Sequence, residues 1–256
     1  MAIFDVYDED VVSLLQEVDE AKERLQLAGM FSPEDLERLK RAFLPDRISD
    51  TLNIESIQVN PRLTQAVLEG LTISDTDRYA ETAIVNVNEA NIFIENAAKA
   101  RDSLSIGHIS EINRRIEIGT GESREPGKLR QINVKITGSA LQPTDWPDIE
   151  KTLKHFLHVI GESRHHPLVK ACFAHWVVSF VHPFENGNGR TARLVQDFML
   201  IREGLLPVGI PIGRRADYYE ALANADNGDG MSLVRIVASA ELGSTASNGA
   251  TIALPE

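Results

Sequence analysis

The chain has 256 residues, of which 43% are hydrophobic and 25% are charged. These proportions are typical of a globular protein with a full hydrophobic core. Lys and Arg number 26 and Asp and Glu number 38, which gives a formal net charge of −12. This balance argues against non-specific nucleic-acid binding and against attraction to an anionic membrane, because both need a basic face. We therefore expect no nucleic-acid partner and no membrane partner.

Cysteine content and the apolar runs narrow the class further. Cys172 is the only cysteine in the sequence, which excludes an intramolecular disulfide and a multi-cysteine zinc site. The opening residues, MAIFDVYDED, lack the basic and apolar regions of a signal peptide. No apolar run reaches the roughly 18 residues that cross a bilayer. A cytoplasmic protein is expected.

Apolar residues recur at helical spacing along most of the chain, beginning with Val11, Leu15 and Val18. Ser32-Pro33-Glu34-Asp35 has the features of a helix start, with Pro at the first helical position and acids in the first turn. After that start, helices are predicted over 49–59, 75–101, 108–118, 144–161, 168–181, 217–225 and 231–240. Two further helices are predicted by their ends, at 69 and at 202.

One segment predicts a different structure. Residues 129–136 alternate apolar and polar side chains with period two, which predicts a strand in a single hairpin. The fold class is therefore all-α (mainly helical), with one small β-hairpin. The predicted organisation is a helical arm (1–48), a helical segment (49–103), a core domain (104–240) and a flexible tail (241–256).

The residues that are best suited to catalysis or ligand binding lie together in 182–193, HPFENGNGRTAR. Two glycines let the backbone turn and approach a ligand, and the free N–H groups of the following helix form an anion site. Arg190 and Arg193 supply charged forks that suit phosphate oxygens, and His182 suits a general base near neutral pH. A Gly/Asn-rich turn or a lone His is commonly structural, but their combination predicts phosphoryl or nucleotidyl transfer.

The same residues resemble the signature of the Fic family, His-x-Phe-x-Asp/Glu-Gly-Asn-Gly-Arg-x-x-Arg. The resemblance covers about 49–240, and its further segments are 112–119, 127–138, 165–184 and 214–229. It implies an α-helical Fic (Fido) core whose hairpin is a flap. It also implies a protein adenylyltransferase, which moves AMP from ATP to a Ser, Thr or Tyr hydroxyl of a target protein and releases pyrophosphate.

By this resemblance, His182 is the general base and Phe184 is a buried anchor of the loop. The residues that the resemblance places at the nucleotide and its phosphates are Asn186, Gly187, Asn188, Gly189, Arg190, Arg193, Tyr218 and Tyr219. For the two tyrosines, packing within a helix is an equal alternative. The residues that it places in a flap clamping the target by strand addition are Leu129, Arg130, Ile132, Asn133, Val134 and Ile136.

Asn186 departs from the signature, since the family has an acid there that holds Mg²⁺. The family implies Mg²⁺ or Mn²⁺ as a cofactor, and an amide oxygen at Asn186 binds a hard cation more weakly than a carboxylate. Two alternatives therefore stay open. One is an enzyme that uses another nucleotide donor or removes AMP, and the other is a nucleotide-binding regulatory module with impaired catalysis.

A second motif lies upstream. Thr51-Leu-Asn-Ile-Glu55-Ser56 resembles the family's inhibitory motif, Ser/Thr-x-x-x-Glu-Gly/Asn, except for its final Ser. The resemblance implies that Thr51 and Glu55 are inhibitory and that Glu55 pairs with Arg193, although a solvated helical Glu is the alternative. The implied partners are ATP and a target protein, and a homodimer is left open.

Overall fold

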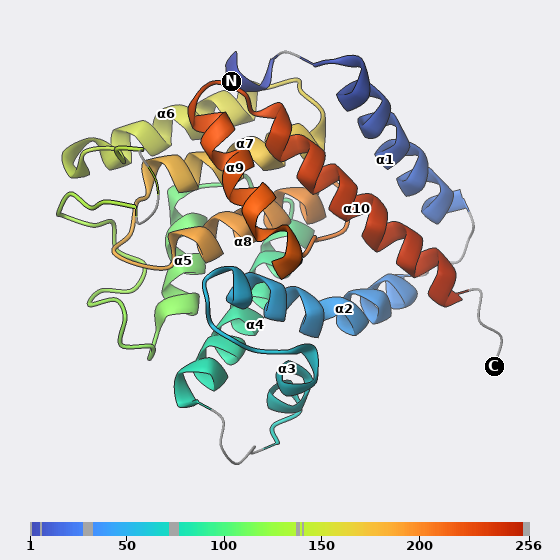
Figure 1. The fold of residues 1–256 in the computed structure, drawn as a ribbon, viewed down its shortest axis with the longest axis horizontal. Helices are drawn as coiled ribbons and strands as arrows, with labels where there is room; N and C mark the ends of the chain where they lie inside the picture. The colour runs from blue at the N-terminus through green and yellow to red at the C-terminus, as the bar shows by residue number, and fades with distance from the viewer. Residues whose placement is uncertain are drawn as a thin grey trace.

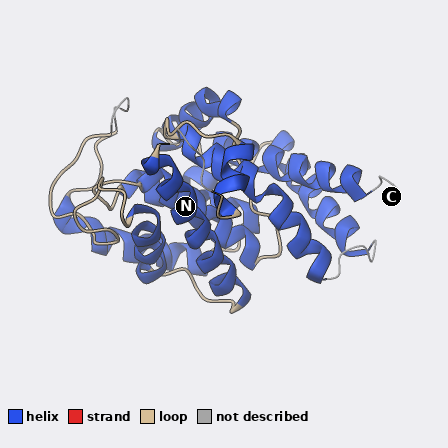
Figure 2. Ribbon diagram, turned by 90° about the horizontal axis from the view of Figure 1, so that it is seen from below, coloured by secondary structure: helices blue, strands red, loops and turns tan. Residues whose placement is uncertain are grey.

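The computed structural model describes residues 2–5, 7–27, 33–71, 77–136, 139 and 141–252. These residues form ten α-helices and three short 3-10 helices, and Figure 2 shows the described part of the chain without a strand. The elements are η1 (Ala2–Phe4), α1 (Glu9–Leu27), α2 (Pro33–Ile54), α3 (Pro61–Leu68), α4 (Arg78–Lys99), α5 (Ile106–Glu117), η2 (Trp146–Asp148), α6 (Ile149–Glu162), α7 (Pro167–Val181), α8 (Asn188–Arg202), η3 (Ile212–Arg214), α9 (Arg215–Asp226) and α10 (Met231–Ile252).

Two helices joined by a short loop, α7 and α8, form the centre of the fold (Figure 1). Most side chains of both helices are buried, because each is surrounded by other helices. Helices α4 and α5 pack on α8, while α6, α9 and α10 pack on α7. Cys172 is fully buried in α7, as expected. No helix among the described residues is long and apolar enough to cross a membrane.

The N-terminal segment packs onto the C-terminal helix, since α1 lies along α10 (Figure 1). The face of α1 that bears Val11, Leu15 and Val18 is buried there. Helix α2 runs without a break through the expected boundary at 48/49, and α10 continues past Ala240 to Ile252. The division into four segments and the flexibility of the tail stay predictions.

A buried ion pair fixes α2 on the core. Arg47 Nη2 lies 3.0 Å from Asp197 Oδ2 of α8 and donates to Asn91 Oδ1 of α4 at 2.8 Å. The side chains of Arg47 and Asp197 are only 9% and 7% exposed. Asp197 also accepts a hydrogen bond from the backbone N–H of Val208. This pair therefore joins α2, α4 and α8.

The predicted hairpin is wrong. The described residues of 129–136 form no strand, and the backbone N–H of Arg130 donates to Pro183 O at 2.9 Å. The Arg130 guanidinium donates to the carbonyls of His182 and Ile132 at 2.8 and 2.6 Å. A segment with period-two alternation forms a strand only where a partner strand makes hydrogen bonds with its backbone groups. Here the backbone of Arg130 bonds instead to the loop before α8.

The buried pair gives a stability prediction. Asp197→Ala leaves the Arg47 guanidinium buried without its counter-charge, so we expect the free energy of unfolding in urea to fall by about 3 kcal/mol. Glu150→Ala breaks the exposed Glu150–Lys154 pair and is the matched control, with little change expected. Equal losses in the two variants would contradict a structural role for the buried pair.

Candidate active site

The loop between α7 and α8 is held in one conformation by its own side chains. Asn188 binds both backbone groups of Phe184, accepting from its N–H and donating to its carbonyl, each at 2.9 Å. The Phe184 ring is 1% exposed and anchors the loop in the core. His182 and Gly187 have positive φ angles of 51° and 74°. For His182 this is a strained backbone conformation that the surrounding bonds must maintain.

The imidazole of His182 has a defined tautomer. Its Nδ1 lies 3.3 Å from Ser179 O, and a carbonyl can only accept, so Nδ1 carries the proton and Nε2 keeps a lone pair. Burial lowers the pKa of His182, and the nearby Arg130 charge lowers it further, against the opposing effects of Ser179 and Glu55. A neutral His182 with a free Nε2 has the protonation state of a general base.

Arg130 lies beneath His182 rather than in an exposed flap. The side chain is 3% exposed and donates to the His182 carbonyl. The other residues expected in the flap are spread over different environments: Leu129 packs against the core, Val134 and Ile136 are half-buried, Ile132 is 56% exposed, and Asn133 binds Asp145 and Trp146 N. Arg130 thus supports the loop between α7 and α8, a position that sequence alternation did not indicate.

The end of α2, with Glu55 directly after it, meets the loop at the first turn of α8. Glu55 Oε1 lies 2.7 Å from Arg193 Nη2 and directly against Gly189, where any Cβ would collide with it. The first N–H groups of a helix have no acceptor within the helix. Burial raises the pKa of Glu55, but the Arg193 charge and hydrogen bond outweigh this effect, and the net pKa is lowered. The anion at the start of α8 is therefore a carboxylate of the chain itself.

Most hydrogen bonds of the Arg193 guanidinium are made to residues at the end of α2. Its Nε donates to Thr51 Oγ1 at 2.7 Å, and its Nη2 donates to Thr51 O at 3.0 Å in addition to Glu55. Its Nη1 donates to the Tyr218 hydroxyl at 3.3 Å. Thr51 and Glu55 together, rather than Glu55 alone, hold this guanidinium.

The two tyrosines differ in their surroundings. Tyr218 is 1% exposed and its hydroxyl also bonds His175 Nε2, so it belongs to the core, and burial raises its pKa to about 12. Tyr219 is 42% exposed and donates to Ile54 O at 3.3 Å. Arg215 donates to the same carbonyl at 2.8 Å. Only Tyr219 has a surface that a nucleotide could contact.

Glu117, the last residue of α5, lies at the site although the sequence did not indicate it. Its carboxylate is fully buried, lies 2.7 Å from Arg190 Nη2, and leaves no room for a Cβ at Gly187. Burial raises the pKa of Glu117 despite Arg190. Arg190 Nε and Nη1 are buried and lack a hydrogen-bond partner among the described residues. A glutamate at the end of an amphipathic helix carries no signal of this contact, which depends on how α5 packs on α8.

Asn186 does not present its amide oxygen to a metal. Oδ1 accepts from the backbone N–H of Gly187 at 2.9 Å, and Nδ2 donates to Glu122 Oε2 at 3.3 Å. In the part of the chain that the structure describes, no three His, Cys, Asp or Glu side chains gather as a metal site. The residues present therefore do not fit the family's Mg²⁺ arrangement.

Comparison with known proteins agrees with this geometry. Residues 103–200 match the Fic/DOC family, a range that contains α5, α7 and nearly all of α8. The chain contains a Fic/DOC domain. Its similarity to solved structures extends beyond that range. A structure of Fic-1 from Caenorhabditis elegans superposes with a TM-score of 0.82 at 26% identity, covering 94% of this chain and 72% of that one.

Other Fic proteins give the same result. The fic-1 protein adenylyltransferase of Caenorhabditis elegans is 31% identical over 73% of this chain and 38% of its own length. The protein adenylyltransferase Fic of Nematostella vectensis is 29% identical over 88% of this chain and 53% of its own length. This chain thus spans about half or less of these relatives. A Fic domain protein of Bacteroides thetaiotaomicron shares the fold, with a TM-score of 0.80 at 20% identity.

Ser56 offers a test of the backbone conformation that follows α2. It has a positive φ of 65°, a conformation that Gly adopts without steric cost and a β-branched residue does not. We expect Ser56→Gly to raise the free energy of unfolding by about 0.5–1 kcal/mol and Ser56→Val to lower it. Urea unfolding measures both. The opposite order of the two variants would show that the end of α2 is not fixed in this conformation.

Arg130 offers a test of the loop. Removing its charge in Arg130→Met should raise the pKa of His182, while Arg130→Lys keeps the charge and should shift it less. An NMR titration of the His182 ring protons measures this pKa directly. Lys128→Met, at an exposed side chain two residues away, is the control. A His182 pKa that is unchanged or lower in Arg130→Met would contradict the contact.

Proposed function

We propose that this chain is a protein adenylyltransferase that moves AMP from ATP to a hydroxyl side chain of a target protein. The observation that carries the proposal is the neutral His182, with Nε2 free, on the loop that leads into the first turn of α8. The names of the relatives support the same activity. The cytoplasmic location expected from the sequence belongs to this proposal.

The proposed reaction is a single displacement at the α-phosphorus. The target hydroxyl transfers its proton to Nε2 of His182 as its oxygen bonds the α-phosphorus. The bond from that phosphorus to the bridging oxygen breaks, and pyrophosphate leaves with the electron pair. The start of α8 and the Arg190 nitrogens that lack partners would bind the phosphates, since helix N-termini and guanidinium groups stabilise anions. Catalysis of this type depends on positioning and charge stabilisation.

The same proposal includes autoinhibition by α2. Arg193 cannot hold Glu55 and a γ-phosphate at once, so a bound ATP would lose that contact and its α-phosphorus would lie out of line with the hydroxyl. A charge-assisted hydrogen bond such as the one between Glu55 and Arg193 contributes roughly 1.5–3 kcal/mol net. Losing this bond would raise the fraction of molecules that hold ATP in line for transfer by about 10- to 100-fold.

A regulatory module that binds nucleotide without transferring AMP is the second candidate. It is favoured by Asn186, whose amide is used within the loop and toward Glu122. An enzyme with another donor, or one that removes AMP, uses the same residues. The presence of His182 favours transfer over the regulatory module, because a site that only binds nucleotide needs no base.

The deciding experiment is labelling with ATP that carries a radioactive α-phosphate, in cell extract, with Mg²⁺ and Mn²⁺ in parallel. We expect Glu55→Gly to label protein about 10- to 100-fold more than the unchanged chain. Glu69→Gly, at the end of α3, controls for a glycine at a helix end. No label with Glu55→Gly, in a preparation that binds ATP, would favour the regulatory module.

His182 and Arg193 are tested in the Glu55→Gly background. Adding His182→Ala should abolish labelling and leave ATP affinity nearly unchanged, because the base does not hold the nucleotide. Adding Arg193→Ala should cancel the gain, because the γ-phosphate loses its ligand. Labelling at full rate without His182 would remove this residue from the mechanism.

A further inference from the structure

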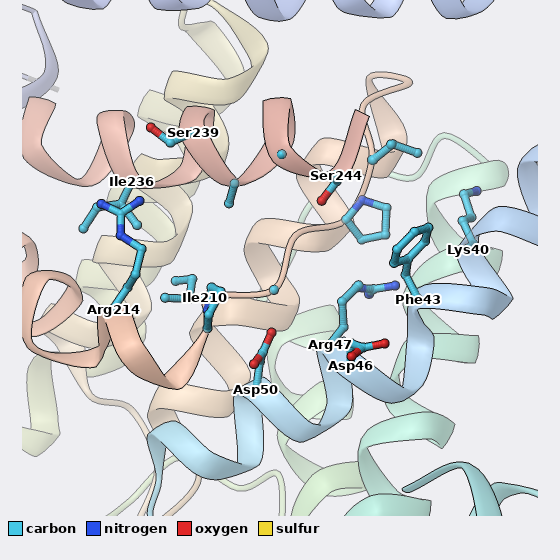
Figure 3. Close-up of a pocket in the computed structure, with 16 residues that line it drawn as sticks. Lys40, Phe43, Asp46, Arg47, Asp50, Ile210, Arg214, Ile236, Ser239 and Ser244 are labelled. Carbon is cyan, nitrogen blue, oxygen red and sulfur yellow. The ribbon is translucent and has the colours of Figure 1, made fainter. Parts of the chain in front are cut away.

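Outside the candidate active site, α2, α10 and segment 206–211 line a cavity of about 350 Å³, and Figure 3 shows Ile210 of this segment between the two helices. The volume lies at the lower end of the range of small-molecule sites. Most of the lining is apolar: Phe43, Leu206, Pro207, Ile210, Pro211, Ile236 and Ala240. Such a cavity suits a ligand with a small apolar body.

Two carboxylates line the same cavity, Asp46 and Asp50, one helical turn apart on α2. Neither has an ion pair among the residues that the structure describes. Burial, and then the charge of Asp46, raises the pKa of Asp50 to about 6. The other charged lining residues are engaged elsewhere: Arg47 with Asp197, Arg214 with Asp217, and Lys40 with a partner of its own. A cation beside the two carboxylates would relieve their repulsion.

Arg47 indicates that the ligand should also carry an anionic group. Its side chain is 9% exposed, and its Nη2 is bonded to Asn91 and Asp197. Its Nε and Nη1 are buried and have no hydrogen-bond partner among the described residues. Buried donors that lack acceptors destabilise a fold, so an acceptor in the cavity would be favourable. A ligand here therefore needs a cationic group and an anionic group.

We propose that this cavity binds a small zwitterion with an apolar side chain, as a free aliphatic amino acid is. Its ammonium group would lie beside Asp46 and Asp50, and its carboxylate would accept from Arg47. Its side chain would contact Phe43 and the apolar wall of α10.

The site would also control the activity, a step that rests on the proposed function. The cavity exists only while α2 lies against segment 206–211 and α10, so the ligand binds this arrangement alone. Thr51 follows on the same helix, and Glu55 comes directly after the last residue of that helix, Ile54. By linkage, the bound zwitterion stabilises the arrangement in which Glu55 meets Arg193, and it acts as an inhibitor.

Isothermal titration calorimetry of the full chain tests the site without any labelling assay. The probes are leucine, 3-methylbutylamine, which lacks the carboxylate, and 4-methylpentanoate, which lacks the ammonium group. We expect leucine to bind saturably and about tenfold or more tighter than either analogue. Absence of leucine binding, or an analogue that binds as tightly, overturns the proposal.

Two variants locate the site. Asp50→Asn removes a half-buried carboxylate that has no counter-ion among the described residues, so the chain is expected to fold, and Ala240→Leu fills the cavity from α10. Each should weaken leucine binding by about tenfold or more, whereas Glu162→Gln, on the exposed face of α6, should not. Unchanged binding in both variants overturns the location.

The regulatory step has a separate readout. Leucine should lower labelling by the unchanged chain and leave labelling by Glu55→Gly unaffected. Leucine that binds but changes neither reaction keeps the site and refutes its control of α2.

Discussion

An arginine side chain that is almost completely buried must find hydrogen-bond acceptors, and Arg193 finds them on α2. It lies one turn inside α8, where Thr51 and Glu55 supply a hydroxyl, a carbonyl and a carboxylate. The rest of the site depends on this arrangement, because the same guanidinium faces the position where a phosphate would bind. Under the proposed function, a bound nucleotide would therefore compete with α2 for Arg193, and the stability of the docked helix would decide how strongly α2 competes.

The two carboxylates at the start of α8, from Glu55 and Glu117, are held in different ways. On one side, Glu55 comes from α2, which is fixed by Arg47 and by the bonds of Arg215 and Tyr219 to Ile54 O. On the other side, Glu117 pairs with Arg190 from within the core. Each arginine of the signature thus has one carboxylate in the resting structure. Only the α2 carboxylate can be withdrawn without disturbing the α5–α8 contact, so control of the site is expected from α2.

The sequence predicted what depends on local chemistry. The apolar run of α7, the glycines of the loop and the following helix lie next to each other in the chain, and the structure contains all three. It also predicted the contact between Glu55 and Arg193, through a resemblance rather than through periodicity. Arg130 and Glu117 were misjudged or missed because their partners are distant backbone carbonyls and a distant guanidinium, which no spacing rule indicates. The predicted hairpin was wrong for a related reason, because the alternation of side chains describes one strand and does not show whether a partner strand lies beside it.

Gly189 lies where these requirements meet. Any side chain at this position would occupy the space that the Glu55 carboxylate fills, and it would also narrow the approach of a ligand to the first turn of α8. Under the proposed function, the Glu55 carboxylate would occupy part of the volume that the phosphates of ATP need, so it would misplace the nucleotide sterically as well as electrostatically. A side chain at Gly189 would therefore displace the Glu55 carboxylate and also hinder the approach of a phosphate, whereas a change at Glu55 itself would remove the proposed inhibition and leave the first turn of α8 open.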